Sequence, residues 1–430
     1  MNFAIHTLGC KVNQYESNVI MELLEERGLQ QVQPSEKADI YIINSCTVTA
    51  QGDKKSRQIL RRLKRQNPDA IMVLTGCYPQ AFPEEASKIK EADIITGATN
   101  RHQLVEDILS FAQKREKIAN IIPHERHEEF EKMSIHSFNE RTRAFLKIQD
   151  GCERYCTYCI IPYSRGFVRS KNPKDLALEV KELARNGYKE IVLVGINLSS
   201  YGKGEDFGLV DAIKICAEQE GIERVRLGSI EPDLLSDEEL RAMAEIPEFC
   251  PQFHLSLQSG CDETLKRMNR HYDTAFYRDL VSRIRKHFEN ASITTDIMVG
   301  FAGETDEEFE KSARFAEEIG FAKSHVFPYS IRKGTTAEKF KNHVSEEIKR
   351  QREKEMLQRT DKVRESFLKT QVGLTETVLT ETKAQNGYLE GYTKNYTPVR
   401  FKSESTKPGD IVRVKISSAD KDFCLGEIIA

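Results

Sequence analysis

The sequence predicts an α/β protein with three parts: a doubly wound parallel α/β domain, an open (β/α)6 barrel and a small antiparallel β-barrel. Two patterns support this prediction. Short apolar runs alternate with helical periodicity from the first residues to about residue 345, which is typical of βαβ units. After Gly373 the pattern changes to short alternating strands separated by Gly, Pro and Asn, which is typical of a small barrel. A chain of 430 residues is long enough for several domains with separate cores.

The first part, residues 1–112, contains four apolar runs that we expect to be parallel strands. Helical stretches, such as Lys54–Gln66, lie between the runs. The four runs are Phe3–Leu8, Ile40–Asn44, Ile71–Thr75 and Ile94–Thr96. A single residue separates each of the first three runs from a cysteine.

These cysteines are Cys10, Cys46 and Cys77. The carboxyl ends of parallel strands lie along one edge of a sheet, where ligands bind, so three cysteines distant in sequence can meet there. Gly9 and Gly76 precede two of them, which fits a tight turn beside a bulky group. The alternative is three buried structural cysteines, but the threefold repetition of the placement favours a shared ligand.

The second part, residues 138–370, repeats the alternation after a charged linker at residues 113–137. Six strands with intervening helices indicate an open barrel, because a closed (β/α)8 barrel would need eight. The expected strands are Phe145–Gln149, Ile191–Val194, Val225–Leu227, Phe253–Leu257, Thr294–Val299 and His325–Phe327. A long charged helix, Ser345–Thr370, ends this part, and residues 371–430 form the small barrel.

A second set of three cysteines follows the first strand of this barrel as C-x3-C-x2-C: Cys152, Cys156 and Cys159. Thiolate is the soft ligand that suits iron–sulfur clusters. Three thiolates leave one iron of a four-iron cluster open to another ligand, which indicates chemistry rather than electron transfer alone. A structural zinc site would need a fourth nearby Cys or His, and none occurs in the loop. We expect Tyr158 to lie beside the open iron.

Composition narrows the class of protein. The net charge of −3 does not by itself indicate nucleic acid as a partner. We expect no signal peptide and no membrane span, and therefore a reducing cytoplasm, where ten cysteines indicate metal or redox use rather than disulfides. The remaining cysteines, Cys216, Cys250, Cys261 and Cys424, fit ordinary buried positions.

The C-x3-C-x2-C loop, the aromatic residue before its last cysteine and the (β/α)6 pattern resemble the radical S-adenosylmethionine (SAM) superfamily. With the three-cysteine domain before it and a TRAM/OB-like barrel after it, the whole chain is similar to the methylthiotransferase branch. The segments TLGCKVNQYES and TRAFLKIQDGCERYCTYCIIPYSRG are similar to the MtaB-type enzymes, which act on N6-threonylcarbamoyladenosine in tRNA. Isopentenyladenosine enzymes instead tend to carry YGCQMN.

This resemblance implies two [4Fe–4S] clusters and two molecules of SAM. The cluster on Cys152, Cys156 and Cys159 would bind SAM, and one electron would cleave it to a 5′-deoxyadenosyl radical. The other three cysteines would hold a cluster that carries the sulfur, which a second SAM would methylate. The product would be a methylthio group on C2 of N6-threonylcarbamoyladenosine at position 37 of a tRNA anticodon loop. No catalytic residue is implied beyond the cluster ligands.

Weaker implications concern the other SAM contacts. The resemblance assigns them to Tyr158, Gly195, Glu231 and Gln258, the last three of which lie just past predicted strands. Asn197 stands where the superfamily usually has an acidic residue. A purely structural turn explains each of the three strand-end positions equally well.

Basic residues are the candidate RNA contacts, because phosphates bind clusters of Lys and Arg. One cluster is the helix at residues 54–65 and another is the stretch 266–286, which includes Arg270. The alternative for each is a solvated helix face. The residues that we expect to contact RNA are Lys55, Arg61, Arg62, Lys394 and Arg400.

The implied partners are the tRNA anticodon loop, a reductant such as flavodoxin or ferredoxin, and a sulfur donor. Within the same class, the alternative targets are isopentenyladenosine in tRNA and an aspartate of a ribosomal protein. A different class remains open as well, a non-catalytic iron–sulfur protein that binds RNA.

Overall fold

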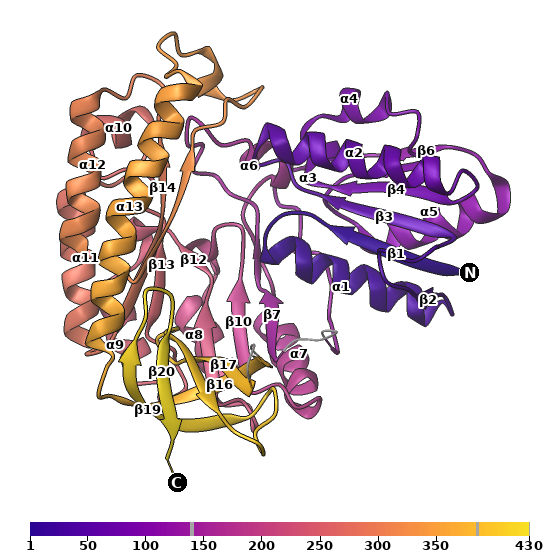
Figure 1. Ribbon diagram of the computed structural model, residues 1–430. Coiled ribbons are helices and arrows are strands. Elements are labelled where there is room, and N and C mark those ends of the chain that lie inside the picture. Colours follow the sequence, from indigo (N-terminus) through magenta and orange to yellow (C-terminus); the bar gives the residue numbers. More distant parts are fainter. Residues whose placement is uncertain (138–141, 384–386, 430) are drawn as a thin grey trace.

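The computed structural model describes residues 1–137, 142–383 and 387–429. Three parts follow one another along the chain: an N-terminal α/β domain, a central partial barrel and a small C-terminal barrel (Figure 1). The predicted fold class is therefore confirmed. Within the described ranges, no helix combines the length and the apolar character that crossing a membrane requires.

The N-terminal domain is built on a six-stranded parallel sheet with the order β2-β1-β3-β4-β5-β6. The four predicted strands form its centre, and two short strands extend its edges. The strands are β1 (Asn2–Thr7), β2 (Gln30–Gln31), β3 (Ile40–Ser45), β4 (Ile71–Gly76), β5 (Ile94–Thr96) and β6 (Ile118–Asn120). The last of these lies in the expected linker, where it pairs with β5.

Helices cover both faces of this sheet because successive residues of a buried strand point to opposite sides. Ile40 and Ile42 of β3 pack under one pair of helices, and Tyr41 and Ile43 pack under the helices of the other face. The first pair is α1 (Lys11–Glu26) and α5 (Arg101–Lys114), and the other face carries α2 (Ala50–Gln66), α3 (Cys77–Ala81) and α4 (Pro83–Ser87). The arrangement is doubly wound, as predicted.

The central part has six parallel strand positions that do not close into a cylinder. They lie in two sheets, β11-β10-β7 and β12-β13-β14-β15, in which all neighbouring strands are parallel. The third strand position is divided at Gly228 into two short strands, β11 and β12. The amide of Gly228 donates to the carbonyl of Leu193 at 2.8 Å. The strands are β7 (Arg143–Lys147), β10 (Glu190–Val194), β11 (Arg224–Leu227), β12 (Ser229–Ile230), β13 (Gln252–Leu255), β14 (Ser292–Val299) and β15 (Lys323–Pro328).

Helices wrap the outside of this partial barrel, and α13 runs down towards the C-terminal part (Figure 1). Many begin at a capping side chain, as where Ser236 accepts from the amide of Glu239 at 3.2 Å. The α-helices are α6 (Ile161–Arg165), α7 (Pro173–Arg185), α8 (Leu209–Ala217), α9 (Asp237–Ala244), α10 (Asp262–Arg267), α11 (Thr274–His287), α12 (Asp306–Ile319) and α13 (Glu346–Thr370). Short elements between them are η1 (Leu198–Ser200), η2 (Pro232–Leu234), η3 (Thr336–Lys339), β8 (Gln149–Asp150) and β9 (Arg169–Ser170).

The C-terminal part is a closed five-stranded barrel with the order β16-β17-β18-β20-β19. It differs from the expected antiparallel barrel in one respect, because β18 and β20 pair in parallel. Leu368 of α13 fills its core and thereby ties it to the central part. The strands are β16 (Thr375–Lys383), β17 (Tyr388–Thr393), β18 (Pro398–Lys402), β19 (Ile411–Ala419) and β20 (Cys424–Ile428).

Candidate functional site

The first three cysteines lie at one edge of the N-terminal sheet. Cys10 follows β1, Cys46 follows β3 and Cys77 follows β4, and these are three neighbouring strands of one parallel sheet. Gly9 has a φ of 115°, and a Cβ there would lie 3.0 Å from the Cβ of Cys46. Gly76 has a φ of 96°, and a Cβ there would lie 2.7 Å from the carbonyl oxygen of Ser45. Glycine is therefore required at both turns, because only it allows the cysteine loops to approach this closely.

Asn13, in the first turn of α1, holds these loops together. Its buried amide nitrogen donates to the carbonyls of Leu8 at 3.1 Å and Ser45 at 3.0 Å, the residues beside the first two cysteine turns. Its oxygen accepts from the thiol of Cys10 at 3.4 Å and from Arg165 at 3.0 Å. One side chain thus joins two cysteine loops of the N-terminal domain to a residue of the central part.

Arg165 brings the central part to the third cysteine. Its side chain is fully buried, and its Nε donates to the Sγ of Cys77 at 3.2 Å. Its two terminal nitrogens bind the carboxylate of Glu16 at 2.5 and 3.0 Å. Arg165 is the last residue of α6, the helix that follows the C-x3-C-x2-C loop. The two sets of cysteines are therefore connected through a single arginine.

Glu16 is the centre of a buried charge network across this interface. Besides Arg165, it pairs with Arg101 at 2.6 Å and with Lys147 at 2.7 Å, and Lys147 also pairs with Asp150 at 2.5 Å. Burial alone would raise the pKa of Glu16, but the three cations outweigh this effect and lower the pKa to about 2. The same balance between burial and neighbouring cations lowers the pKa of Asp150. Both carboxylates therefore stay ionised inside the interface.

The second three cysteines lie in the loop between β8 and α6. The amide of Cys159 donates to the carbonyl of Cys156 at 2.9 Å, and the amide of Cys152 donates to the carbonyl of Gly166 at 3.0 Å. Tyr158 packs edge-on against Phe301, with ring centroids 6.3 Å apart. These contacts hold the loop in a tight turn at the carboxyl ends of the central strands.

A buried arginine reaches this loop as well. Arg270 donates from Nη1 to the Sγ of Cys156 at 3.3 Å and pairs with Glu231 at 2.6 Å. The sequence had placed Arg270 in a basic stretch that faces RNA, and this is wrong because its side chain is only 2% exposed. Asn269 before it has a φ of 57°, which turns the chain inward directly after α10.

The three strand-end residues predicted to contact SAM lie near this loop. Gly195 follows β10, and a Cβ there would lie 2.8 Å from the amide oxygen of Gln149. Glu231 follows β12 and pairs with Arg270, while Gln258 follows β13 and is buried with a φ of 67°. All three stand on the edge of the partial barrel where the cysteine loop lies.

A cavity of about 680 Å³ lies where the three parts of the protein meet. Cys10 lines it from the N-terminal domain, Gly195 lines it from the central part, and Tyr392 and Arg400 line it from the C-terminal barrel. Residues of β11, β13, β14 and β15 also line it, for example Arg226, His254, Asp296 and His325. A cavity of this volume is large enough for a small organic ligand.

Comparison with known proteins explains the three parts. Residues 2–97 match a family described as uncharacterized protein family UPF0004, residues 146–316 match the radical SAM superfamily, and residues 369–429 match the TRAM domain. The threonylcarbamoyladenosine tRNA methylthiotransferase MtaB of Bacillus subtilis is 38% identical over 99% of this chain and 96% of its own length. The chain belongs to the radical SAM tRNA methylthiotransferases.

Other relatives agree with this membership. MtaB of Aquifex aeolicus is 36% identical over 97% of this chain and all of its own. The tRNA-2-methylthio-N(6)-dimethylallyladenosine synthase of Clostridium botulinum is also 36% identical, over 99% of this chain and 97% of its own. The radical SAM methyltransferase TsrM of Kitasatospora setae shares the fold alone, with a TM-score of 0.56 at 12% identity over 76% of this chain and 74% of its own.

This methylthiotransferase therefore is an enzyme that acts on tRNA and uses SAM with a [4Fe–4S] cluster. Both cysteine sets fit such a group chemically, since each offers three free thiols. Across residues 1–137, 142–383 and 387–429, no three His, Cys, Asp or Glu side chains converge on a single metal ion. Burial raises the pKa of the Cys77 thiol to about 12, so bound iron would have to displace its proton.

The predicted RNA contacts fall into two groups that the fold does not bring together. Lys55 and Arg62 are exposed on α2, and Arg61 beside them pairs with Glu91 at 3.2 Å. Lys394 instead donates to the carbonyl of Pro247 at 2.6 Å, between the C-terminal barrel and the central part.

Arg400 is also engaged within the protein. It pairs with Glu390 at 2.7 Å and lies over the ring of Phe423, and it lines the cavity. Two tyrosines of the same barrel, Tyr392 and Tyr396, stack on each other with centroids 4.4 Å apart. Arg226 of the central part lies 4.7 Å from the ring of Tyr396, so this stack anchors the barrel.

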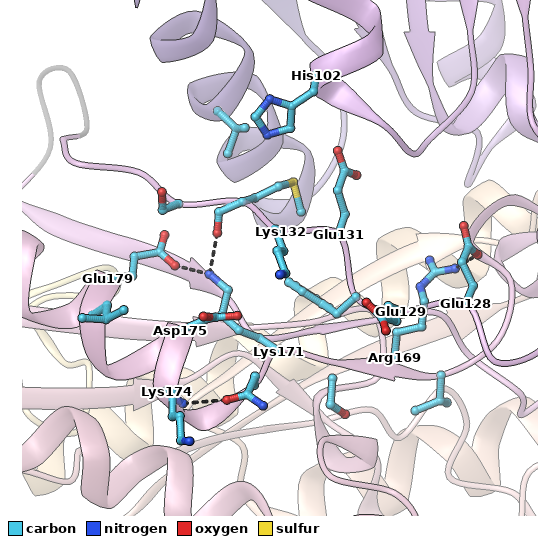
Figure 2. A pocket seen from close by; sticks show the side chains of 18 of the residues that line it. His102, Glu128, Glu129, Glu131, Lys132, Arg169, Lys171, Lys174, Asp175 and Glu179 are labelled. Atoms are coloured by element: carbon cyan, nitrogen blue, oxygen red, sulfur yellow. Dashed lines mark hydrogen bonds and ion pairs between the residues drawn. The ribbon is translucent and has the colours of Figure 1, made fainter.

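A larger cavity, of about 1210 Å³, lies apart from the cysteines (Figure 2). It separates α1 and the linker from α7, and charged side chains of both signs line it. Lys171 is bound to Glu179 and Arg169 is bound to Glu128. None of the predicted site residues lines this cavity, and we assign no chemistry to it.

Sequence reasoning missed the residues that join the domains. Asn13 and Glu16 stand in the segment TLGCKVNQYES, and Arg165 stands in the segment that ends in YSRG. None of these three residues was given a role from the sequence. A signal was present, because Asn and Glu at positions 13 and 16 share a helix face directly after Cys10. The sequence does not show that Arg165 is the partner of these two residues across the interface. The four remaining cysteines are buried, as expected: Cys216, Cys250, Cys261 and Cys424.

Proposed function

We propose that this enzyme transfers a methylthio group to C2 of N6-threonylcarbamoyladenosine at position 37 of tRNA, using two [4Fe–4S] clusters and two molecules of SAM. The observation that carries the proposal is the shared cavity. Cys10 of one cysteine set, Gly195 beside the other set and Arg400 of the TRAM barrel all line it. A substrate in this cavity would reach both sites at once.

Each set of residues has a distinct task in this proposal. Cys152, Cys156 and Cys159 would hold the cluster that binds SAM, and Cys10, Cys46 and Cys77 would hold the auxiliary cluster. When bound, the clusters and SAM supply a hydrogen-abstracting radical and the sulfur that is transferred. An aromatic C–H offers no useful proton chemistry near neutral pH, so the reaction needs that radical.

Residues beside the SAM cluster would bind and orient SAM. Glu231, which pairs with Arg270 at 2.6 Å, would accept from ribose hydroxyls. Gly195 and Gln258 would contact the methionyl part. Tyr158, which packs against Phe301, would shield the open iron.

The choice of nucleoside rests on the character of the cavity. Its lining contains five Lys and Arg side chains: Lys11, Arg226, Lys323, Arg364 and Arg400. An isopentenyl group would desolvate such side chains without compensation, whereas the threonylcarbamoyl group is polar and anionic. Relatives named for both nucleosides exist at similar identity, so the proposal rests on the lining rather than on the relatives.

We also propose the conditions under which the enzyme works. A cytoplasmic location supplies the reducing environment that thiolate-bound clusters need. A reductant such as flavodoxin or ferredoxin would deliver the electron, and a separate sulfur donor would recharge the auxiliary cluster. The TRAM barrel and the exposed basic face of α2 would hold the tRNA.

The test is an anaerobic reaction of the reconstituted enzyme with SAM, dithionite and tRNA that carries N6-threonylcarbamoyladenosine. Mass spectrometry of the nucleosides is expected to show the 2-methylthio derivative, with equal amounts of 5′-deoxyadenosine and S-adenosylhomocysteine. Product only from isopentenyladenosine tRNA would reject the substrate. No 5′-deoxyadenosine above background would favour the non-catalytic iron–sulfur protein.

A further inference from the structure

The shared cavity has an excess of positive charge that the protein does not balance. Three carboxylates line it, Asp296, Glu390 and Asp422. Each has a partner: Asp296 contacts His254 at 3.3 Å, Glu390 pairs with Arg400 at 2.7 Å and Asp422 pairs with Arg364 at 3.1 Å. The cavity can therefore offer no further free carboxylate to a bound cation.

The lining cations are not all paired. Arg226 is bound by Glu190 at 2.8 Å, outside the lining. Lys11 and Lys323, in contrast, have no ion pair and no hydrogen bond from the ammonium to any residue that the structure describes. The ammonium of Lys11 instead lies 5.6 Å from the ring centroid of Phe145. Two free ammonium groups in one cavity predict an anionic ligand there.

The two lysines reach the cavity from different parts of the protein. Lys11 follows Cys10 directly and is the first residue of α1, so it lies beside the auxiliary cysteine site. Lys323 is the first residue of β15, and the carboxyl ends of the central strands carry Gly195 and the SAM site. Lys323 is therefore at the amino end of the central strands, near Arg364 and Asp422. The ammonium of Lys11 lies over Phe145, and the charged groups that act on it are Arg143, Arg226, Glu190 and Cys10.

We propose that Lys11 is a specificity-determining residue whose ammonium binds the carboxylate of the N6 substituent of the target adenosine. C2 and the carbon that bears N6 flank N1 on the adenine ring. When C2 faces the cysteine site, the N6 substituent therefore extends along the same edge, towards the residue next to Cys10. Lys323, near Arg364 and Asp422, would meet a phosphate of the anticodon loop instead. This assignment rests on the proposed function.

The test separates the two anionic groups that RNA can offer. Anaerobic fluorescence anisotropy measures the Kd of the reconstituted enzyme for two anticodon stem-loops. One carries N6-threonylcarbamoyladenosine and the other carries the methyl ester of its carboxylate. A charge-assisted hydrogen bond contributes enough that the wild-type enzyme should prefer the acid by about tenfold. Lys11→Met, which keeps the apolar stem, should abolish this preference, and Lys11→Arg should keep most of it.

Lys323→Met is the matched control. It should weaken binding of the acid and the ester equally and flatten the salt dependence, as the loss of a phosphate contact does. Iron and sulfide content, measured for every variant, checks that the site next to Cys10 is still loaded. If Lys11→Met loses iron, Lys11→Gln, which remains polar, replaces it in the comparison.

The outcomes separate this inference from the proposed function. The inference fails if Lys11→Met retains the tenfold preference, if the wild-type enzyme shows none, or if Lys11→Met weakens acid and ester equally with a flatter salt dependence. That last result would assign Lys11 to a phosphate. A wild-type enzyme that binds the acid better yet forms no 2-methylthio product would overturn the proposed function alone.

Discussion

Arg165 donates a hydrogen bond from its Nε to the Sγ of Cys77 at 3.2 Å, with the arginine side chain fully buried. The donor belongs to the central part and the acceptor belongs to the N-terminal domain. Because α6 follows the loop of Cys152, Cys156 and Cys159, this contact joins the segment that would hold one cluster to a ligand of the other. Hydrogen bonds and charges at ligand sulfurs are among the means by which proteins set cluster potentials.

Arg165→Gln is predicted to lower the reduction potential of the auxiliary cluster. Reduction makes the cluster more negative, so a guanidinium beside Cys77 stabilises the reduced form. The midpoint potential can be followed by EPR during a redox titration, in a background where Cys156→Ala removes the SAM cluster. Arg169→Gln is the control, because Arg169 lies in the same network without contacting a cysteine. Equal potentials in Arg165→Gln and the parent would remove Arg165 from this role.

Asn13→Ala is predicted to lose the auxiliary cluster while keeping the SAM cluster. The amide joins the loops of Cys10 and Cys46, and without it those loops are free to separate. Iron content should fall from about eight to about four per chain, the difference expected for one four-iron cluster. Asn67→Ala, which removes an amide that contacts only Tyr41 at the other end of the sheet, should retain all the iron. Full iron loading of Asn13→Ala would contradict the assignment.

Glu16→Gln is predicted to destabilise the domain interface by about 3–5 kcal/mol, because it leaves buried cations without their carboxylate. The pKa of Glu16 is lowered from 4.5 to about 2, so its stabilisation is complete above pH 4.5 and is lost as the pH falls towards 2. Urea unfolding of the iron-free chain should therefore show a difference from wild type that is constant between pH 6 and pH 8. A difference that changes across that range would mean that another group titrates.

Substituting Lys55, Arg61 and Arg62 together by Ala is predicted to weaken tRNA binding and flatten its salt dependence. Three lost phosphate contacts should reduce the slope of log Kd against log salt by about 2–3. Arg350, Lys354 and Lys362 are exposed on α13, a helix of the central part that lies apart from α2 (Figure 1). Their triple substitution is the control. If both triple variants show the wild-type slope, α2 does not contact the tRNA.

The fold could be predicted from the sequence because its periodicity is local. Apolar runs such as Ile40–Asn44 identify the strands, and parallel pairing then brings the cysteines that follow them to one edge. The short edge strand β2 (Gln30–Gln31) has no apolar residue and could not be recognised in this way. The parallel pairing of β18 with β20 depends on barrel closure, which no local pattern encodes.

Side-chain partners were less predictable, because they come from distant segments. Nothing near Arg165 in sequence reveals that Glu16 and Cys77 bind it. For Arg270, the basic residues around it in sequence suggested an exposed position. Its side chain is instead buried, because the backbone turn at Asn269 directs it inward. The contact of Lys394 with the carbonyl of Pro247 could not be predicted for the same reason, because the two residues are distant in sequence.

The measurement that tests the account most directly is the iron and sulfide content of three reconstituted chains. The wild-type enzyme should bind about eight irons, and Cys46→Ala and Cys156→Ala should each bind about four, because each loses one four-iron cluster. A wild-type chain with about four irons, unchanged in Cys46→Ala, would show that the N-terminal cysteines hold no cluster and would contradict the two-cluster account.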